Sequence, residues 1–107
     1  MLLNTDKLMT IDINAIARVS MTIGHRYGKT NVLYTLLHGL SNRRGEVTLS
    51  DDELCVLSPY TTKKATQRAL SMLLKLEAIS VLHRWQSGRV KYAVWPRAKH
   101  LNFKGVE

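Results

Sequence analysis

The sequence predicts a small α+β domain in which several helices precede a two-stranded β-hairpin. Apolar residues recur at spacings of three and four over residues 12–23, 31–41 and 62–76, as they do in amphipathic helices. Residues 79–86 and 89–95 are rich in β-branched and aromatic side chains, and the glycine-containing pair Ser87-Gly88 separates them as a hairpin turn would. A length of 107 residues suffices for one core without disulfides. We therefore expect a single domain over residues 1–107.

The first elements are a short strand at residues 7–11 and a helix over residues 12–23, which Asp12 or Asn14 can start. The apolar stripe expected on this helix comprises Ile13, Ile16, Ala17, Met21 and Ile23. Glycines break the chain at residues 24–28, where Arg26 and Lys29 are either exposed loop residues or contacts to a nucleic-acid backbone. Thr30 or Asn31 caps the next helix, over residues 31–41, with an apolar side formed by Val32, Leu33, Leu36, Leu37 and Leu40.

A short strand and a short helix come next. Residues 41–45 have the composition of a turn, and residues 46–49 form a strand that could pair with the hairpin. Ser50 with Glu53 three residues later is the spacing of a capping box, and acidic residues favour the positive end of a helix. Pro59 lacks an amide hydrogen and ends the helix near Ser58.

The helix that starts at Thr61 or Thr62 has one apolar and one basic face. Its apolar face consists of Ala65, Ala69, Leu70, Leu73 and Leu76. Its polar face consists of Lys63, Lys64, Gln67, Arg68 and Ser71. Lysine and arginine can neutralise phosphate or donate to guanine, and glutamine can pair with adenine through two hydrogen bonds. A solvated face is the alternative interpretation of such a charge pattern.

The hairpin predicts a register and two faces. A two-residue loop places residue 85 opposite 90, 83 opposite 92 and 81 opposite 94. The apolar face then carries Val81, His83, Trp85, Val90, Tyr92 and Val94. We expect His83 to be a core histidine and Trp85 and Tyr92 to pack in the core. The other face carries Arg84, Arg89 and Lys91, which could follow a phosphate backbone.

The charge is concentrated in the second half of the chain. Residues 1–54 hold six basic and six acidic residues, whereas residues 55–107 hold ten basic and two acidic residues, so the net charge of +8 lies in the second half. A local basic excess is the electrostatic signature of a nucleic-acid-binding protein.

The order helix, tight turn, helix and hairpin resembles the winged helix-turn-helix family of bacterial, phage and plasmid DNA-binding regulators. The resemblance covers about residues 30–95 and lies mainly in Ala69-Leu70, Leu73 and Ile79 of the run 62–79. Two positions depart from the family pattern: Glu77 replaces a glycine that often ends the helix, and Thr66 replaces an apolar residue, which slightly weakens the expected core face. The resemblance implies a three-helix core with a β-hairpin wing, preceded here by the extra helix at 12–23.

The resemblance also implies how such a domain would act on double-stranded DNA. Lys63, Lys64, Gln67 and Arg68 would enter the major groove, and Thr61 or Thr62 would bind phosphate. Arg84, Arg89 and Lys91 would contact the backbone or the minor groove from the wing. Because one small domain reads few base pairs, we expect a homodimer on an inverted repeat, with residues 12–23 and the tail 96–107 as candidate dimer elements.

We therefore expect a sequence-specific transcriptional regulator, most simply a repressor. Plasmid or phage replication-initiation and control proteins use the same domain and are an alternative. A winged-helix module that binds RNA or another protein is a second alternative, and a small basic nuclease using His25, His83 or His100 is a third.

The sequence offers little for enzymatic or metal chemistry. None of the four histidines lies at a recognised ligand spacing, and Gly28-Lys29-Thr30 lacks the glycine spacing of a phosphate-binding loop. The single cysteine, Cys55, is flanked by apolar residues and is expected to be a buried structural thiol in a reducing cytoplasm. We expect no catalytic residues, metal, cofactor, small-molecule ligand or membrane span.

Overall fold

The computed structural model describes residues 12–24 and 27–105. Over these residues the chain is an α+β fold with four helices and a three-stranded antiparallel sheet in the order β1-β3-β2. The strand expected at residues 7–11, together with His25 and Arg26, lies outside the described residues. The elements are α2 (Ile13–Ile23), α3 (Gly28–Leu40), β1 (Glu46–Ser50), α4 (Asp51–Leu57), α5 (Lys63–Lys75), β2 (Ile79–Arg84) and β3 (Arg89–Val94).

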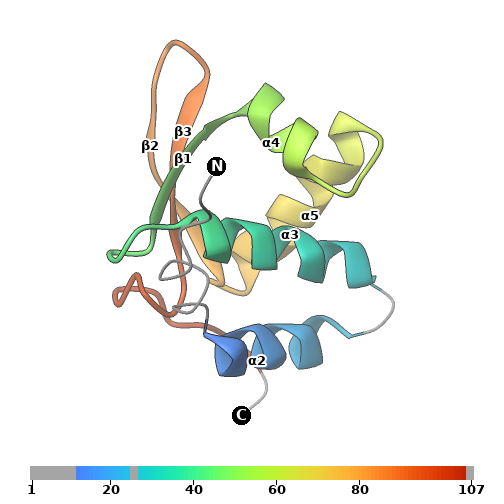
Figure 1. The fold of residues 1–107 in the computed structure, drawn as a ribbon, viewed down its shortest axis with the longest axis vertical. Helices are drawn as coiled ribbons and strands as arrows, with labels where there is room; N and C mark the ends of the chain where they lie inside the picture. The colour runs from blue at the N-terminus through green and yellow to red at the C-terminus, as the bar shows by residue number, and fades with distance from the viewer. Residues whose placement is uncertain (1–11, 25–26, 106–107) are drawn as a thin grey trace, which may run out of the picture.

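The helices lie on one side of the sheet, and the core fills the space between the two layers (Figure 1). Fully buried core side chains come from both layers: Val19, Leu33, Tyr34, Leu37, Leu54, Leu73, Ile79 and Val94. The strand expected at 46–49 is present as β1 and pairs with β3, with Val47 opposite Tyr92 and Leu49 opposite Val90. This arrangement leaves the outward faces of α2 and α5 at opposite ends of the helical layer.

Local capping explains where three of the helices begin. The Asp12 carboxylate accepts a hydrogen bond from the Ala15 amide at 3.0 Å, and the Thr62 hydroxyl accepts one from the Ala65 amide at 3.1 Å. The predicted capping box of α4 is confirmed, because the Ser50 hydroxyl and the Glu53 carboxylate each accept from the other residue's backbone amide at 3.1 Å. Each cap satisfies an amide that has no partner within its helix.

The end of α5 shows how the chain turns without the glycine that is usual at this position. Glu77 adopts a left-handed φ of 55°. The Ala78 amide donates to the Leu73 carbonyl at 3.0 Å, and the Glu77 amide donates to the Leu74 carbonyl at 3.1 Å. These two bonds make a Schellman motif, in which glycine normally avoids the steric conflict between Cβ and the backbone. Glu77 instead forms an ion pair with Lys104 at 3.3 Å.

We expect Glu77→Gly to raise the free energy of unfolding by about 0.5–1 kcal/mol. Removing the Cβ relieves the left-handed strain, which is worth about 1 kcal/mol, while the lost surface ion pair contributes less. Urea unfolding measures the change. Glu77→Ala is the matched control, because it removes the ion pair and keeps the Cβ, so it should give no gain. An equal gain for both variants would mean that the carboxylate, and not the backbone, causes the strain.

The hairpin register differs from the prediction. The Trp85 amide donates to the Arg89 carbonyl at 2.9 Å and Gly88 has a φ of 93°, so the loop holds three residues, 86–88. The extra loop residue places His83 opposite Lys91 and Arg84 opposite Val90. A bulge between Val81 and His83 then shifts the pairing by one residue. Val81 therefore lies opposite Tyr92 and Ile79 opposite Val94, so that both side chains face the core. His83 and Trp85 are therefore exposed, and their expected core positions were wrong.

The buried face of α2 also differs from the prediction. Ala15, Val19 and Ile23 face the core, and Ile16 is half-buried, whereas Ile13, Ala17 and Met21 point to solvent. A similar difference occurs on α3, where Tyr34 joins Leu33 and Leu37 inside while Val32 and Leu40 are exposed. Both helices carry apolar residues on more than one side, so periodicity alone could not select the inner face.

The tail after β3 is an ordered arm that packs against α2 and the ends of α3 and α5. The Trp95 and Phe103 rings stack with centroids 4.6 Å apart, and the Arg18 guanidinium lies 5.1 Å from the Trp95 ring centroid. Arg97 Nη1 donates to the Ser41 carbonyl at 3.3 Å, and the Lys104 amide donates to the Leu76 carbonyl at 2.7 Å. The tail thereby connects α2, the end of α3 and the end of α5.

Candidate nucleic-acid interface

A network of hydroxyl groups fixes the turn between α4 and α5. The Thr66 hydroxyl lies 3.1 Å from Ser58 Oγ and 3.2 Å from the Thr62 carbonyl oxygen and shares its single proton between them, and the Tyr60 amide donates to Ser58 Oγ at 3.1 Å. Thr66 is fully buried. Its hydroxyl is therefore a satisfied part of the turn rather than a weak point of the apolar face, which corrects the expectation from the sequence.

The start of α3 supports the same turn. The Tyr60 hydroxyl and the buried Thr30 hydroxyl are 2.7 Å apart and share a hydrogen bond. The Lys29 ammonium lies 5.9 Å from the Tyr60 ring centroid. Lys29 is exposed, so Tyr60 brings a cation of α3 beside the segment that leads into α5.

The outward face of α5 presents the predicted polar residues together. Ala69, Leu70 and Leu73 are buried and fix the rotation of the helix. The following side chains are all exposed: Thr61, Thr62, Lys63, Lys64, Gln67, Arg68 and Ser71. Lys75 is also exposed and was not predicted, although its spacing of four from Ser71 places it on the same face.

The charges in the first turns of α4 and α5 are opposite in sign. Helix α4 begins with Asp51, Asp52 and Glu53, which suits the positive end of the helix dipole. Helix α5 begins with Lys63 and Lys64 and has no acidic residue in its first turn. These cations lie at the helix end that disfavours them. An anion bound there would interact favourably with both the lysines and the helix end.

The hairpin cations do not form the single face that was predicted. The cross-strand partner of Arg84 is the buried Val90, so Arg84 projects from the side of the sheet that the helices occupy. Lys91 projects from the other side and lies 3.3 Å from the Glu46 carboxylate. Arg89 lies 3.2 Å from the Glu53 carboxylate. Hydrogen bonds from Ser50, and secondarily the nearby Arg89, lower the pKa of Glu53, so this carboxylate stays charged.

We expect Arg84→Ala to lower the slope of log affinity against log salt by about 0.9, the effect of one lost phosphate contact. Arg89→Ala should lower it by clearly less, because Glu53 already neutralises that guanidinium. Fluorescence anisotropy with a labelled duplex at several salt concentrations measures both slopes. Equal decreases would show that Arg89 leaves Glu53 and contacts phosphate when DNA binds.

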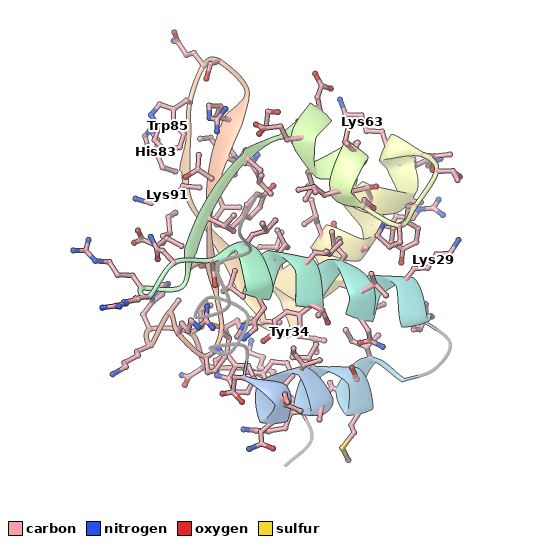
Figure 2. All side chains as sticks on the ribbon, in the orientation of Figure 1. Lys29, Tyr34, Lys63, His83, Trp85 and Lys91 are labelled. Carbon is pink, nitrogen blue, oxygen red and sulfur yellow. The ribbon has the colours of Figure 1, made fainter. Side chains whose placement is uncertain are left out.

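A second group of side chains lies on the opposite side of the sheet. Figure 2 shows His83, Trp85 and Lys91 on the hairpin side that faces away from the helices. The His83 and Trp85 rings meet edge to face with centroids 4.4 Å apart, and Trp85 is 43% exposed. Exposed aromatic rings beside cations can stack on unpaired bases. His83 and Trp85 lie on this outer side because of the β2–β3 register, which the sequence did not predict.

His38 and Cys55 are two further titratable side chains among the described residues. His38 is fully buried, and its Nε2 accepts from the Asp12 amide at 3.0 Å. Burial, with a further contribution from Arg97, lowers the pKa of His38 and favours its neutral form. Cys55 is half-buried rather than buried as predicted.

Within residues 12–24 and 27–105, no three or more His, Cys, Asp or Glu side chains come together in a way that could hold a metal ion. Over the same residues, no helix is both long enough and apolar enough to cross a membrane.

Comparisons of this chain with family models, curated proteins and solved structures found no match.

Proposed function

We propose that this protein is a winged helix-turn-helix regulator that binds specific sequences in double-stranded DNA. The order of elements from α3 to β3, with the sheet order β1-β3-β2, is compatible with that layout. In this proposal α5 is the recognition helix and the β2–β3 hairpin is the wing. The protein acts as a dimer on an inverted repeat and represses transcription.

The observation that carries this proposal is the cationic start of α5. Lys63 and Lys64 occupy the first turn against the helix dipole, and Arg68 extends their charge along the exposed face. Proteins commonly depart from local charge preferences at functional sites. A DNA phosphate beside this turn would compensate for the departure.

The side chains on the exposed face of α5 have different roles in DNA recognition. Lys63, Lys64 and Arg68 contact phosphates or guanine edges, while Gln67 reads adenine in the major groove. Thr61 and Thr62 lie at the helix start, where their hydroxyls and nearby amides can bind a phosphate. Arg84 approaches the backbone from the wing, on the same side of the sheet as the helices. Ser71 and Lys75 extend the contact toward the end of α5.

Selection of bound duplexes from a random-sequence pool tests this proposal. At about 150 mM salt, where non-specific binding is suppressed, we expect enrichment of an inverted repeat. The spacing of its half-sites reports the distance between the two recognition helices. If no sequence is enriched and affinity for duplexes depends only on salt concentration, the protein is not a sequence-specific regulator.

We expect Gln67→Ala to relax the preference at one base pair of the selected site, at a cost of about 1–3 kcal/mol on that site. Affinity for unrelated duplexes should change little, because Gln67 carries no charge. Asn102→Ala is the matched control, since Asn102 is an exposed side-chain amide in the tail, outside α5 and the hairpin. Competition with single base-pair variants of the site measures the preference. Equal weakening on all sequences would remove Gln67 from base recognition.

The exposed ring pair of His83 and Trp85 favours a second candidate function, binding to RNA with unpaired bases. The stacking of unpaired bases on such rings depends little on the nucleotide sequence and does not require the groove of a duplex. Competition between duplex DNA and structured RNA distinguishes the two functions. Preference for RNA, together with quenching of tryptophan fluorescence that Trp85→Phe diminishes, would favour this candidate over the DNA regulator.

A further inference from the structure

The described helix α2 is apolar on two sides, and only one of them faces the core. Ala15, Val19 and Ile23 pack inward at a spacing of four, and Ile13, Ala17 and Met21 repeat that spacing on the outside. Ile13 is 76% exposed and Met21 is 68% exposed. A helix with apolar residues on both sides is usually covered on both. We call the outer row, Ile13, Ala17 and Met21, the α2 stripe.

The α2 stripe carries no charge, although the protein has a net charge of +8. Arg18, the one charged residue within α2, turns to the Trp95 and Phe103 rings of the tail. Asn14 and Ser20, which flank the stripe, are uncharged. A polyanionic partner would find no cation on this surface. A second copy of the chain would meet no like charge there, despite the overall excess of positive charge.

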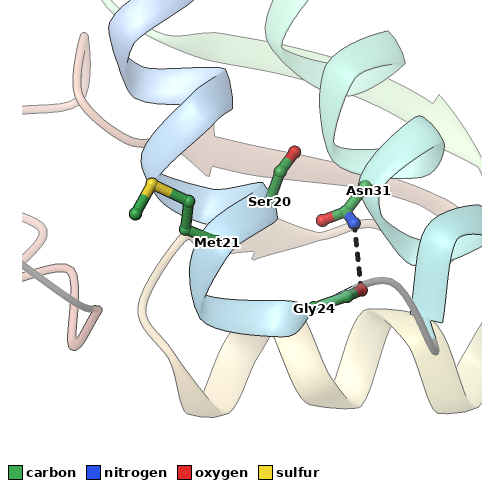
Figure 3. A pocket seen from close by; sticks show the side chains of 4 residues that line it. All are labelled: Ser20, Met21, Gly24 and Asn31. Atoms are coloured by element: carbon green, nitrogen blue, oxygen red, sulfur yellow. Dashed lines mark hydrogen bonds between the residues drawn. The ribbon is translucent and has the colours of Figure 1, made fainter.

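The stripe is also symmetric about its middle residue. If two copies of α2 face each other antiparallel about a two-fold axis through Ala17, Ile13 of one copy meets Met21 of the other. The small Ala17 side chain at the axis allows close approach of the two helices. Beside Met21 lies a hollow lined by Ser20, Gly24 and Asn31, in which the Asn31 amide nitrogen donates to the Gly24 carbonyl at 3.5 Å (Figure 3). The partner's Ile13 end would reach this hollow.

We propose that the α2 stripe is the dimer interface of this protein, in an antiparallel pair of α2 helices. With about 1.5 Å per residue and a diameter of about 10 Å, an 11-residue helix presents a footprint of roughly 160 Å². Stable interfaces bury about 800 Å² of accessible surface per partner, so this pair is weak in the free protein. In the free protein it therefore forms only at high concentration.

The position of α2 makes this dimer compatible with DNA binding. Helix α2 lies at the opposite end of the helical layer from α4 and the start of α5 (Figure 1). A dimer through α2 therefore leaves both α5 faces open. This consequence rests on the proposed function, whereas the interface itself rests only on the α2 stripe.

Thiol crosslinking of the full chain tests the antiparallel pair. In a Cys55→Ser background, Ala17→Cys should crosslink to itself with a short bis-maleimide at about 0.5 mM protein. Ile13→Cys and Met21→Cys should crosslink when mixed and much less when alone. Val56→Cys is the matched control, because Val56 is 84% exposed on α4, away from α2. Crosslinking of Ala17→Cys no faster than Val56→Cys would overturn the proposal, as would protection of Ala17→Cys from a small maleimide in monomeric protein.

Sedimentation equilibrium provides the second measurement. Met21→Glu should raise the dimer dissociation constant at least tenfold, because it places a charge against apolar residues, and Val56→Glu should leave it unchanged. Equal effects of the two variants, or no association of the parent protein at the highest concentration, would overturn the interface. The DNA-binding proposal would survive that result if the α5 variants still lose affinity for duplexes.

Discussion

Replacing Lys63, Lys64 and Arg68 together by alanine should reduce affinity for duplex DNA about 100-fold at about 150 mM salt. Each lost phosphate contact removes about 0.9 from the slope of log affinity against log salt, so three contacts remove about 2.7. The three side chains are exposed on one face of α5, where helix packing is not affected. Anisotropy titrations from about 50 to 300 mM salt measure both quantities.

A second triple variant separates a defined interface from diffuse attraction. Arg43, Arg44 and Lys99 are exposed cations in the turn before β1 and in the tail. Their replacement by alanine removes the same charge but leaves α5 intact, so affinity should change by less than about threefold. Equal losses for the two triple variants would show that total charge governs binding and that α5 is not the interface.

Gly45→Ala should lower the free energy of unfolding by about 3 kcal/mol or more. Gly45 is buried with a φ of 76°, a conformation that costs other residues about 1–2 kcal/mol. A Cβ there would lie 2.7 Å from the Val94 carbonyl oxygen and 2.9 Å from the Arg97 carbonyl carbon, and also against the Ala98 amide nitrogen. These neighbours are backbone atoms, which cannot rotate away, so overpacking adds about 1–3 kcal/mol.

Gly88→Ala is the control for this prediction. Gly88 has a φ of 93°, yet no atom lies within 4 Å of a Cβ at that position. Its replacement should therefore cost only the conformational term, about 1–2 kcal/mol. Urea unfolding of both variants gives the difference. If the two costs were the same, the tail would move away from residue 45 without loss, and the contact between turn and tail would contribute nothing to stability.

The sequence predicted those features that depend on neighbouring residues. The caps at Ser50 and Thr62 bond to amides three residues away, so residue type and spacing were sufficient. The order of elements over the described residues, the pairing of the strand expected at residues 46–49 with the hairpin and the exposed face of α5 also agree with prediction. The apolar face of α5 was clear because its other face is charged.

Features that depend on distant contacts were not predicted. The rotation of α2 follows from its packing on α3, which periodicity could not decide for a helix with apolar residues on both sides. The carboxylate partners of Arg89 and Lys91 come from α4 and β1, and no local pattern indicates them. Thr66 was expected to weaken the apolar face of α5, because the sequence does not show that the Ser58 hydroxyl lies beside it.

The bulge at Leu82 determines where this chain can change in length. With Leu82 removed, the pairs of Val81 with Tyr92 and of His83 with Lys91 would be consecutive rungs of a regular ladder, and every other side chain would keep its face. A one-residue deletion at this position is therefore compatible with the fold. Deletion of one residue within 86–88 would leave a two-residue loop, which can still close with Trp85 opposite Arg89. Relatives of this protein that lack the bulge should accordingly align with a gap at residue 82 and keep the side-chain faces of both strands.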